Sequence, residues 1–276
     1  MRKSIQIYHP EQIAVAAAAG FTEVSYSLSS ERLAYREDCL ERAADIRATL
    51  DAHHVACTQT HLPDYHLLVS SEKREDESES AIHRAIRASA ILGASWAAIH
   101  PRTAVNDGYN RTKSFEDNRR DLTSYLETAE AVGVGLAVEN MPLYPFTQPE
   151  WRFFGGGYEE LIALVDSFSS AHIGICWDFG HAHTAALDQK TALRTVGGRM
   201  KITHVHDNYR NGDHHQMPLL ASVEWHSIDW KQIMPVLGEI GYEGPMTLEL
   251  IQPPAPMQPS FMKLGHDALT ALEAMM

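Results

Sequence analysis

Nine side chains that can bind metal ions stand at or just after the ends of short apolar segments. The segments are VACTQTH, SWAAIH, VGLAVE, IGICWDFGH, ITHVHD with the loop that follows it, and MTLEL. The nine residues are His61, His100, Glu139, Asp178, His181, His204, Asp213, His215 and Glu249. A mixture of imidazole and carboxylate groups suits Mn, Mg, Co or Zn better than a thiolate-seeking ion. Six such coincidences along one chain predict a metal-dependent enzyme.

Four of these residues form the core of the predicted site. Glu139, Asp178, His204 and Glu249 end the last four apolar segments. A carboxylate at such a position is costly to bury unless a metal, water or a charged partner satisfies it. A salt bridge at the rim is the alternative for Glu139, and the repeated pattern makes it the weaker one.

The other five residues form a second tier. A histidine at a strand end often only satisfies a backbone carbonyl, and the DHH stretch taken alone is typical of a solvated loop. The combined pattern raises the case for all five: His61, His100, His181, Asp213 and His215.

Three polar residues lie close to the candidate ligands in the sequence, and each has an expected role. His183 is interpreted as structural. His204 and His206 are two residues apart and share one face of an extended strand, so only one of them need be a ligand. Asp207 is a candidate to orient an imidazole by accepting its second N–H.

The elements that must position these side chains alternate regularly. Strands are predicted at about 4–8, 22–28, 55–60, 95–100, 134–139, 172–178, 200–206 and 245–250. Helices are predicted at about 11–19, 36–52, 72–92, 114–132, 157–167, 184–196, 228–240 and 260–275. This alternation predicts an α/β fold in which helices cover a parallel sheet. We expect one domain over residues 1–276, closed as a (β/α)8 TIM barrel, with an open doubly wound sheet as the alternative. A barrel assembles its active site at the C-terminal ends of its strands.

Two loops are longer than a plain barrel needs, at 141–157 and 209–227. Both follow strands that end in candidate ligands, so both should overhang the same mouth. Residues of the first loop either wall a substrate pocket or pack on the rim, and these are Tyr144, Phe146, Trp151, Arg152 and Phe153.

Composition narrows the class of protein. The formal net charge of −13 argues against broad attraction to nucleic acid. No apolar run approaches the roughly 18 residues that span a bilayer, and the first residues contain no signal-like apolar stretch. A cytoplasmic protein without membrane contact is therefore expected. Cys39, Cys57 and Cys176 form no CxxC pair, so neither disulfides nor a zinc ribbon is predicted.

Together these motifs resemble the xylose-isomerase-like β/α barrel superfamily over nearly the whole chain. The most specific parts are AVEN, WDFGHAH, ITHVHDN with the following DHH, and MTLEL. The superfamily includes sugar isomerases and epimerases, inosose dehydratase, dehydroshikimate dehydratase and the endonuclease IV group. Resemblance to the epimerases implies one divalent ion bound by Glu139, Asp178, His204 and Glu249. It also implies that the two glutamates act as acid and base and that His181 helps to bind substrate.

Resemblance to the endonuclease IV group implies a different metal content. That group binds three zinc ions, and acceptable residues occupy all nine ligand positions here. The implied sets are His61, His100 and Glu139; then Glu139, Asp178, His204 and Glu249; then His181, Asp213 and His215. The segment THLPDYHLL, however, matches the intercalating loop of the repair enzymes poorly, and no basic cluster marks a duplex-binding groove.

The resulting expectation is a metal-dependent isomerase or epimerase of a small sugar, polyol or keto sugar, phosphorylated or not, acting through an enediolate. The cofactor is a divalent ion (Mn, Co, Mg or Zn), with one ion expected and up to three accommodated. The catalytic residues are Glu139, Glu249 and His181, and the substrate contacts are Trp177, Arg152, His61 and His100. The alternatives are a trinuclear-zinc phosphodiesterase acting on abasic DNA, a sugar or inosose dehydratase, and a catalytically silent barrel. Nucleic acid is not expected as a partner, and the sequence leaves open whether copies of the chain form a homo-oligomer.

Overall fold

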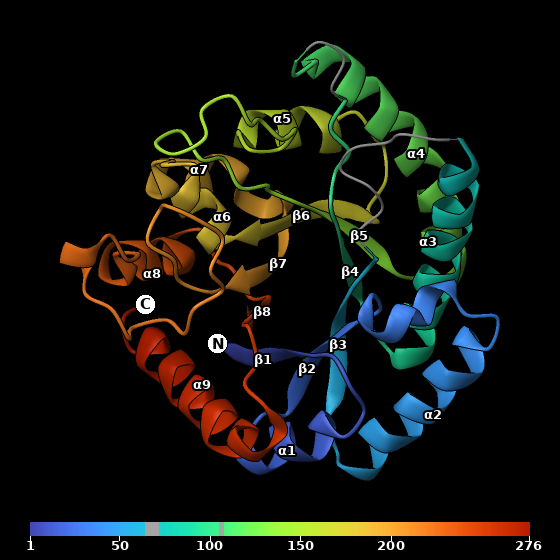
Figure 1. The fold of residues 1–276 in the computed structure, drawn as a ribbon, viewed down its shortest axis with the longest axis horizontal. Helices are drawn as coiled ribbons and strands as arrows, with labels where there is room; N and C mark the ends of the chain where they lie inside the picture. The colour runs from blue at the N-terminus through green and yellow to red at the C-terminus, as the bar shows by residue number, and fades with distance from the viewer. Residues whose placement is uncertain (64–71, 105–107) are drawn as a thin grey trace.

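The eight strands form one closed parallel barrel with the helices outside it (Figure 1). The computed structural model describes residues 1–63, 72–104 and 108–276, and residues 72–78 by their backbone alone. Strand order follows chain order, and β1 pairs with β8 to close the barrel. The expected barrel is confirmed, and the open sheet is wrong. The strands are β1 (Arg2–Ile7), β2 (Glu23–Ser27), β3 (Ala56–His61), β4 (Trp96–Ile99), β5 (Gly135–Glu139), β6 (Ile173–Asp178), β7 (Met200–Val205) and β8 (Pro245–Leu248).

The helices cover the outer face of the barrel, and this explains why whole strands are apolar. All six residues of β6 are buried, because one face meets helices and the other meets the barrel interior. The helices are α1 (Gln12–Ala19), α2 (Cys39–Ala52), α3 (Glu72–Leu92), α4 (Arg111–Val132), α5 (Tyr158–Val165), α6 (Phe179–Thr184), α7 (Gln189–Val196), α8 (Trp230–Glu239) and α9 (Gln258–Glu273). Short 3-10 turns add η1 (Ser30–Tyr35), η2 (Gly197–Arg199), η3 (Val223–Trp225) and η4 (Ala255–Met257).

The prediction of a single helix over 184–196 is wrong. A separate helix, α6, begins directly after β6 because the Asp178 carboxylate accepts a hydrogen bond from the backbone N–H of His181. Ala186 then adopts a left-handed conformation (φ 55°) that interrupts the helix. Asp188 caps the start of α7 by accepting from Lys190 and Thr191. The WDFGHAH motif therefore spans the end of β6 and a short helix of its own at the barrel mouth.

The barrel interior below the candidate ligands is filled by a small cluster of apolar side chains. Ala98, Ala137, Cys176 and Ile202 are buried together there. Burial raises the pKa of the Cys176 thiol to about 12, so this cysteine stays neutral and makes a poor metal ligand. All three cysteines are buried and free.

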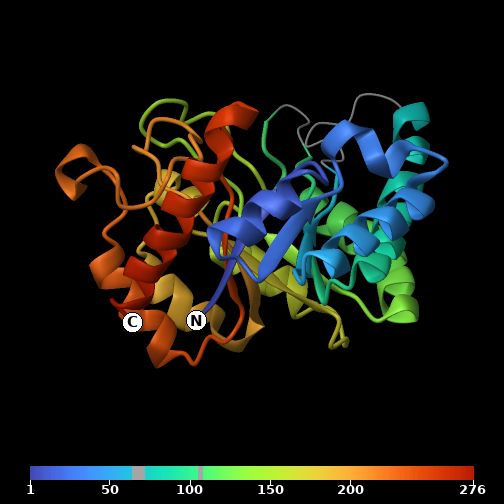
Figure 2. The same ribbon diagram turned by 90° about the horizontal axis from the view of Figure 1, so that it is seen from below.

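Both termini lie at the end of the barrel opposite the two long loops (Figure 2). Loops 141–157 and 209–227 therefore rise over the end where the strands finish. None of the helices that the structure describes has the length and apolar character needed to cross a membrane.

Candidate metal centre

The four core residues meet at the C-terminal end of the barrel. Glu139 and Asp178 are the last residues of β5 and β6, His204 lies in β7, and Glu249 directly follows β8. Their donor atoms all lie within 4.8 Å of one another. His204 Nδ1 lies 3.1 Å from Glu139 Oε1 and 3.1 Å from Glu249 Oε2. Glu139, Asp178 and His204 have no exposed surface, and Glu249 is 7% exposed.

The polar atoms of this core fit a bound cation. Neither carboxylate oxygen of Glu139 and neither ring nitrogen of His204 has an aligned hydrogen-bond partner among the described residues, although all four atoms are buried. Unpaired buried carboxylate oxygens cost too much to persist without compensation. Burial opposes ionisation of Glu139, but the imidazoles of His204 and His100 outweigh it and hold the pKa of this carboxyl well below its usual range. Donors that converge without bonding one another are what a metal site requires.

A second donor set adjoins the core through Glu139. His61 Nε2 lies 3.5 Å from Glu139 Oε2, and His100 Nε2 lies 3.3 Å from the same oxygen. These three side chains again place their donor atoms within 4.8 Å of one another. Glu139 is thereby shared between two potential cation sites.

A third donor set lies on the other side of the core. His181, His206, Asp213 and His215 place their donor atoms within 4.8 Å of one another. Nε2 of His181 and Nε2 of His215 each lie 3.1 Å from Asp213 Oδ2. The three sets implied by the family resemblance are thus all present as spatial clusters, with His206 added to the third.

Backbone contacts select which ring nitrogen each histidine can offer. The Nδ1 atom of His61 lies 2.7 Å from the carbonyl oxygen of Leu62. The Nδ1 atom of His181 lies 2.8 Å from the carbonyl oxygen of Asn140, and that of His215 lies 3.0 Å from the carbonyl oxygen of Glu249. A carbonyl can only accept, so Nδ1 must carry the proton in each ring. The Nε2 lone pair then faces the cluster, as in metal-bound histidines.

In this tautomer, lone pairs of two rings face a carboxylate oxygen, and a cation between them would remove the repulsion. The Nε2 lone pairs of His181 and His215 would both face the oxygen of Asp213 unless a proton or a metal lies between them. Burial favours neutral rings, but Asp178 and Asp213 outweigh it at His181 and raise the pKa of this ring to about 10. At His215, Asp213 and Glu249 likewise overcome burial and raise the pKa to about 9. A divalent ion would replace these extra protons.

Two residues of the site, Asn140 and Gln6, were missed from the sequence, and His206 was considered only as an alternative to His204. His206 bonds Asp178 Oδ2 through Nε2 at 3.1 Å, and its ring stacks on His215 with centroids 4.1 Å apart. Asn140 clamps Asp178 by donating to its carbonyl and accepting from its N–H. Gln6, from β1, donates to Glu249 Oε1 at 2.7 Å. The AVEN motif includes Asn140, so the motif contained a signal, whereas no motif points to Gln6.

Two residues expected to contact substrate, Trp177 and Arg152, lie away from the cluster of donors. Trp177 is fully buried in the hydrophobic core, and its indole N–H donates to Gln189. It faces the helices because neighbouring Asp178 faces the barrel interior, and this placement excludes it from contact with a ligand in the mouth. The Arg152 guanidinium lies over the ring of Tyr109, 5.5 Å from its centroid. In the same loop, Phe146 and Trp151 are 67% and 53% exposed.

The expected role of Asp207 is also wrong. Its carboxylate accepts from the backbone N–H groups of Asn208 and Ile228 and from the indole of Trp230, rather than from an imidazole. Its backbone also pairs with Gln216 in both directions. Asp207 therefore anchors the loop that carries Asp213 and His215. The structural interpretation of His183 agrees with its ring contact with the carbonyl of His226 at 2.6 Å.

An open cavity of about 540 Å³ lies above the cluster, and we call it the mouth cavity. It falls in the size range of small-molecule sites. Its lining residues are Gln6, Tyr8, Ser27, Ser29, Ser30, His61, His100, His181, Asp213, His215, Glu249, Leu250 and Ile251. Any molecule that enters this cavity meets the imidazoles of the second tier and the carboxylate of Glu249.

Comparison with known proteins identifies the family to which the chain belongs. An uncharacterized protein of Methanocaldococcus jannaschii is 28% identical over 171 residues, which is 61% of this chain and about half (55%) of that relative. A D-tagatose 3-epimerase-like protein has a similar structure, with a TM-score of 0.76, 20% identity and 99% of both chains covered. The IolI protein, solved with a zinc atom, is similar with a TM-score of 0.78 and 14% identity over 99% of this chain and 98% of its own. The TM-scores of these two structures show that the chain shares their fold. Residues 13–266 match the family model of the xylose isomerase-like TIM barrel, and the chain therefore belongs to that family.

Proposed function

We propose that the protein is a metal-dependent isomerase or epimerase of a small keto sugar or related polyol. The observation that carries this proposal is the pair of carboxylates on either side of His204, each 3.1 Å from its Nδ1, beneath a cavity of about 540 Å³. Two such groups can remove a proton and return it at another face or carbon. The similar structures include an epimerase-like protein and a protein solved with zinc, in keeping with this proposal.

The core four residues would hold one divalent ion, and the two adjoining sets provide donors for up to two more. When bound, such an ion polarises a substrate carbonyl and makes the adjacent carbon more acidic. Mn, Co, Mg and Zn all suit this mixture of oxygen and nitrogen donors.

Glu249 is the better placed of the two carboxylates to remove the substrate proton. It lines the mouth cavity, whereas Glu139 is fully buried below it. Burial opposes ionisation of Glu249, but His204 outweighs it and keeps the pKa of this carboxyl below its usual range, so the group is a base at neutral pH. Glu249 would then return this proton at the neighbouring carbon, or would pass it to Glu139, whose donor atom lies within 4.8 Å, for return from the opposite side of the enediolate. The other outcome, loss of water from the same enediolate, would make the protein a dehydratase.

The histidines that line the cavity would orient the sugar. His61, His100 and His181 reach the mouth cavity from β3, the end of β4 and α6. Each can bond a hydroxyl or carbonyl oxygen of the substrate. We also propose Arg152 as a substrate contact, because it lies in the loop above the mouth.

A phosphodiesterase on abasic DNA is the second candidate, favoured by the presence of all three donor sets. Clustered metal ions could activate water and stabilise both oxygens of an in-line displacement. The net charge of −13 opposes binding to a polyanion. Residues 64–68 of THLPDYHLL, the segment compared with the intercalating loop, lie outside the described residues.

One experiment separates the candidates. The protein is loaded in turn with Mn, Co, Mg and Zn, its metal content is measured by elemental analysis, and ketoses and inososes are incubated with it in deuterated water. Deuterium incorporation without nicking of abasic duplex DNA is expected. Three zinc ions together with robust nicking would overturn the isomerase proposal. A Glu249→Gln variant should lose the exchange, and retention of full exchange would remove the proposed base.

A further inference from the structure

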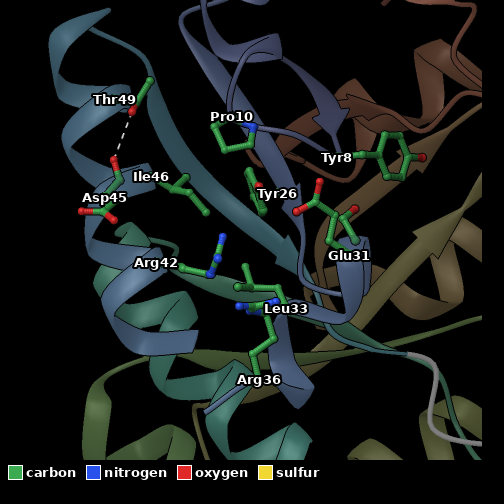
Figure 3. A pocket seen from close by; sticks show the side chains of 11 residues that line it. Tyr8, Pro10, Tyr26, Glu31, Leu33, Arg36, Arg42, Asp45, Ile46 and Thr49 are labelled. Carbon is green, nitrogen blue, oxygen red and sulfur yellow. Dashed lines mark hydrogen bonds between the residues drawn. The ribbon is translucent and has the colours of Figure 1, made fainter. Parts of the chain in front are cut away.

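A second, smaller cavity lies beside the mouth cavity, and we call it the rim pocket. Its volume is about 130 Å³, and Tyr8, Tyr26, Ser30, Glu31, Leu33 and Ile46 are among the residues that line it. It lies outside the barrel wall, between β2, η1 and α2 (Figure 3). The two cavities adjoin because Tyr8 and Ser30 line both of them.

Tyr26 gives the rim pocket an unused polar group. Its side chain is 3% exposed and points into the pocket between Ile46 and Glu31 (Figure 3). The phenol oxygen makes no hydrogen bond with any residue that the structure describes. This oxygen is not fully enclosed by protein atoms, so it faces the pocket and can bond water there. A ligand hydroxyl that reaches the pocket can replace that water as its partner.

The charged groups around the rim pocket have a small negative excess. Arg36 and Arg42 line it, but both guanidinium groups are bound by Asp38, at 2.7 and 2.8 Å from Nε. The remaining charged groups are the carboxylates of Glu31 and Asp45. This lining offers no surplus positive charge to a phosphate or carboxylate, so a neutral ligand fits better.

The walls suit a sugar ring. Pro10, Leu33 and Ile46 supply an apolar surface for C–H groups. Tyr26 can donate to hydroxyls, and Glu31 can accept from them. Glu31 and its neighbour Arg32 are held in left-handed backbone conformations (φ 50° and 55°) that are costly for residues with a side chain. Such strain is more often found where a side chain must face a ligand.

We propose that the rim pocket binds a second, uncharged sugar ring attached to the keto sugar held in the mouth cavity. This inference rests on the proposed function, because it takes the mouth cavity as the site of the reacting ring. That cavity is large enough for one ring by itself, so the space beyond Tyr8 and Ser30 is left for a substituent. The substrate class is then a glycosylated ketose rather than a sugar phosphate.

Binding of defined probes tests the proposal. D-fructose, three ketose disaccharides (lactulose, palatinose and turanose) and fructose 6-phosphate are titrated into the metal-loaded protein by calorimetry. At least one disaccharide should bind tenfold or more tightly than fructose, and the phosphate should not. Tyr26→Phe should reduce that preference by about three- to tenfold, as expected for one neutral hydrogen bond. Thr49→Trp, at a half-buried position of α2 that lines the pocket, should abolish it by filling the pocket.

Tyr35→Phe is the matched control, since Tyr35 lies in η1 near the pocket but does not line it. It should keep the disaccharide preference. If no disaccharide binds more tightly than fructose, or if Tyr26→Phe and Tyr35→Phe behave alike, the proposal is wrong. Deuterium exchange into fructose is measured in parallel. If deuterium enters fructose but no disaccharide binds more tightly than fructose, the rim subsite is wrong and the proposed reaction stands. If a disaccharide binds more tightly through Tyr26 but deuterium enters none of the sugars, the proposed reaction is wrong and the rim subsite stands.

Discussion

Gln6 Nε2 donates a 2.7 Å hydrogen bond to Glu249 Oε1 across the seam where β1 pairs with β8. The barrel therefore closes on a contact between its first strand and the carboxylate that we propose as the base. Gln6 is itself held, because its side-chain carbonyl accepts from Ser25 and its backbone carbonyl accepts from Gln252. This contact leaves Glu249 Oε2 directed at His204.

Removing this contact should weaken metal binding. We expect Gln6→Met to lower the affinity for Mn²⁺ or Co²⁺ by about 10- to 100-fold, the usual effect of losing a residue that orients a ligand. Gln59→Met is the control, since Gln59 is also buried inside the barrel but its amide has no partner among the described residues. Calorimetric titration measures both. Equal losses in the two variants would show that Gln6 does not act through Glu249.

Metal binding should raise the stability of the fold. An ion present at 100 times its dissociation constant adds about 2.7 kcal/mol to the free energy of unfolding. For a chain of this size that corresponds to a rise of roughly 5–10 °C in Tm. Scanning calorimetry with and without EDTA measures the rise. Glu139→Gln should abolish it, and Glu116→Gln, on the exposed face of α4, should retain it. An unchanged Tm in the wild-type protein would contradict metal binding at the core.

Stability should also depend on pH through His83, which lies between α3 and α4. Its ring bonds Thr128 and Ser124. Burial lowers the pKa of this imidazole below the ordinary value of 6.5, and Arg87 acts in the same direction, against Glu79 and Glu127. The folded state thus binds the proton less well than the unfolded state. Its contribution to stability is complete above pH 6.5 and is lost as pH falls from 6.5 through the folded pKa.

His83→Gln should therefore cost less stability at pH 5.5 than at pH 7.5. The difference has an upper limit of about 1.4 kcal/mol for each pH unit. Urea unfolding of the variant and of the wild-type protein at both pH values measures it, and comparing the two proteins cancels effects of metal release. A pH-independent difference for His83→Gln would contradict the prediction.

The sequence predicted the barrel because eight apolar strand runs alternate regularly with helical segments, and strand order then follows from parallel crossovers. It indicated the nine candidate donors because each stands at or just after the end of an apolar run, or in the loop that follows one. Gln6 and His206 could not be selected in the same way. Gln6 lies in the middle of β1, and its contact with Glu249 exists only once the barrel closes. His206 was set aside beside His204, although the end of β7 turns both rings toward the cluster. Trp177 was misplaced because adjacent strand residues face opposite sides, and Asp178 takes the inner one.

Position 180 requires glycine because no space is left for a side chain, which only the structure reveals. A Cβ at this position would lie 2.0 Å from Cε1 of His206. That ring cannot easily move, because it is fully buried, stacks on His215 and bonds Asp178. Gly180→Ala should therefore displace His206, lower the free energy of unfolding by about 1–3 kcal/mol and weaken metal binding about tenfold. Gly238→Ala, on α8, is the matched control, since its Cβ meets nothing within 4 Å. It should leave metal binding unchanged and add up to about 1 kcal/mol of stability through helix propensity. Calorimetric titration and urea unfolding of both variants measure these effects. Wild-type metal affinity in Gly180→Ala would show that the His206 ring has no part in holding the site.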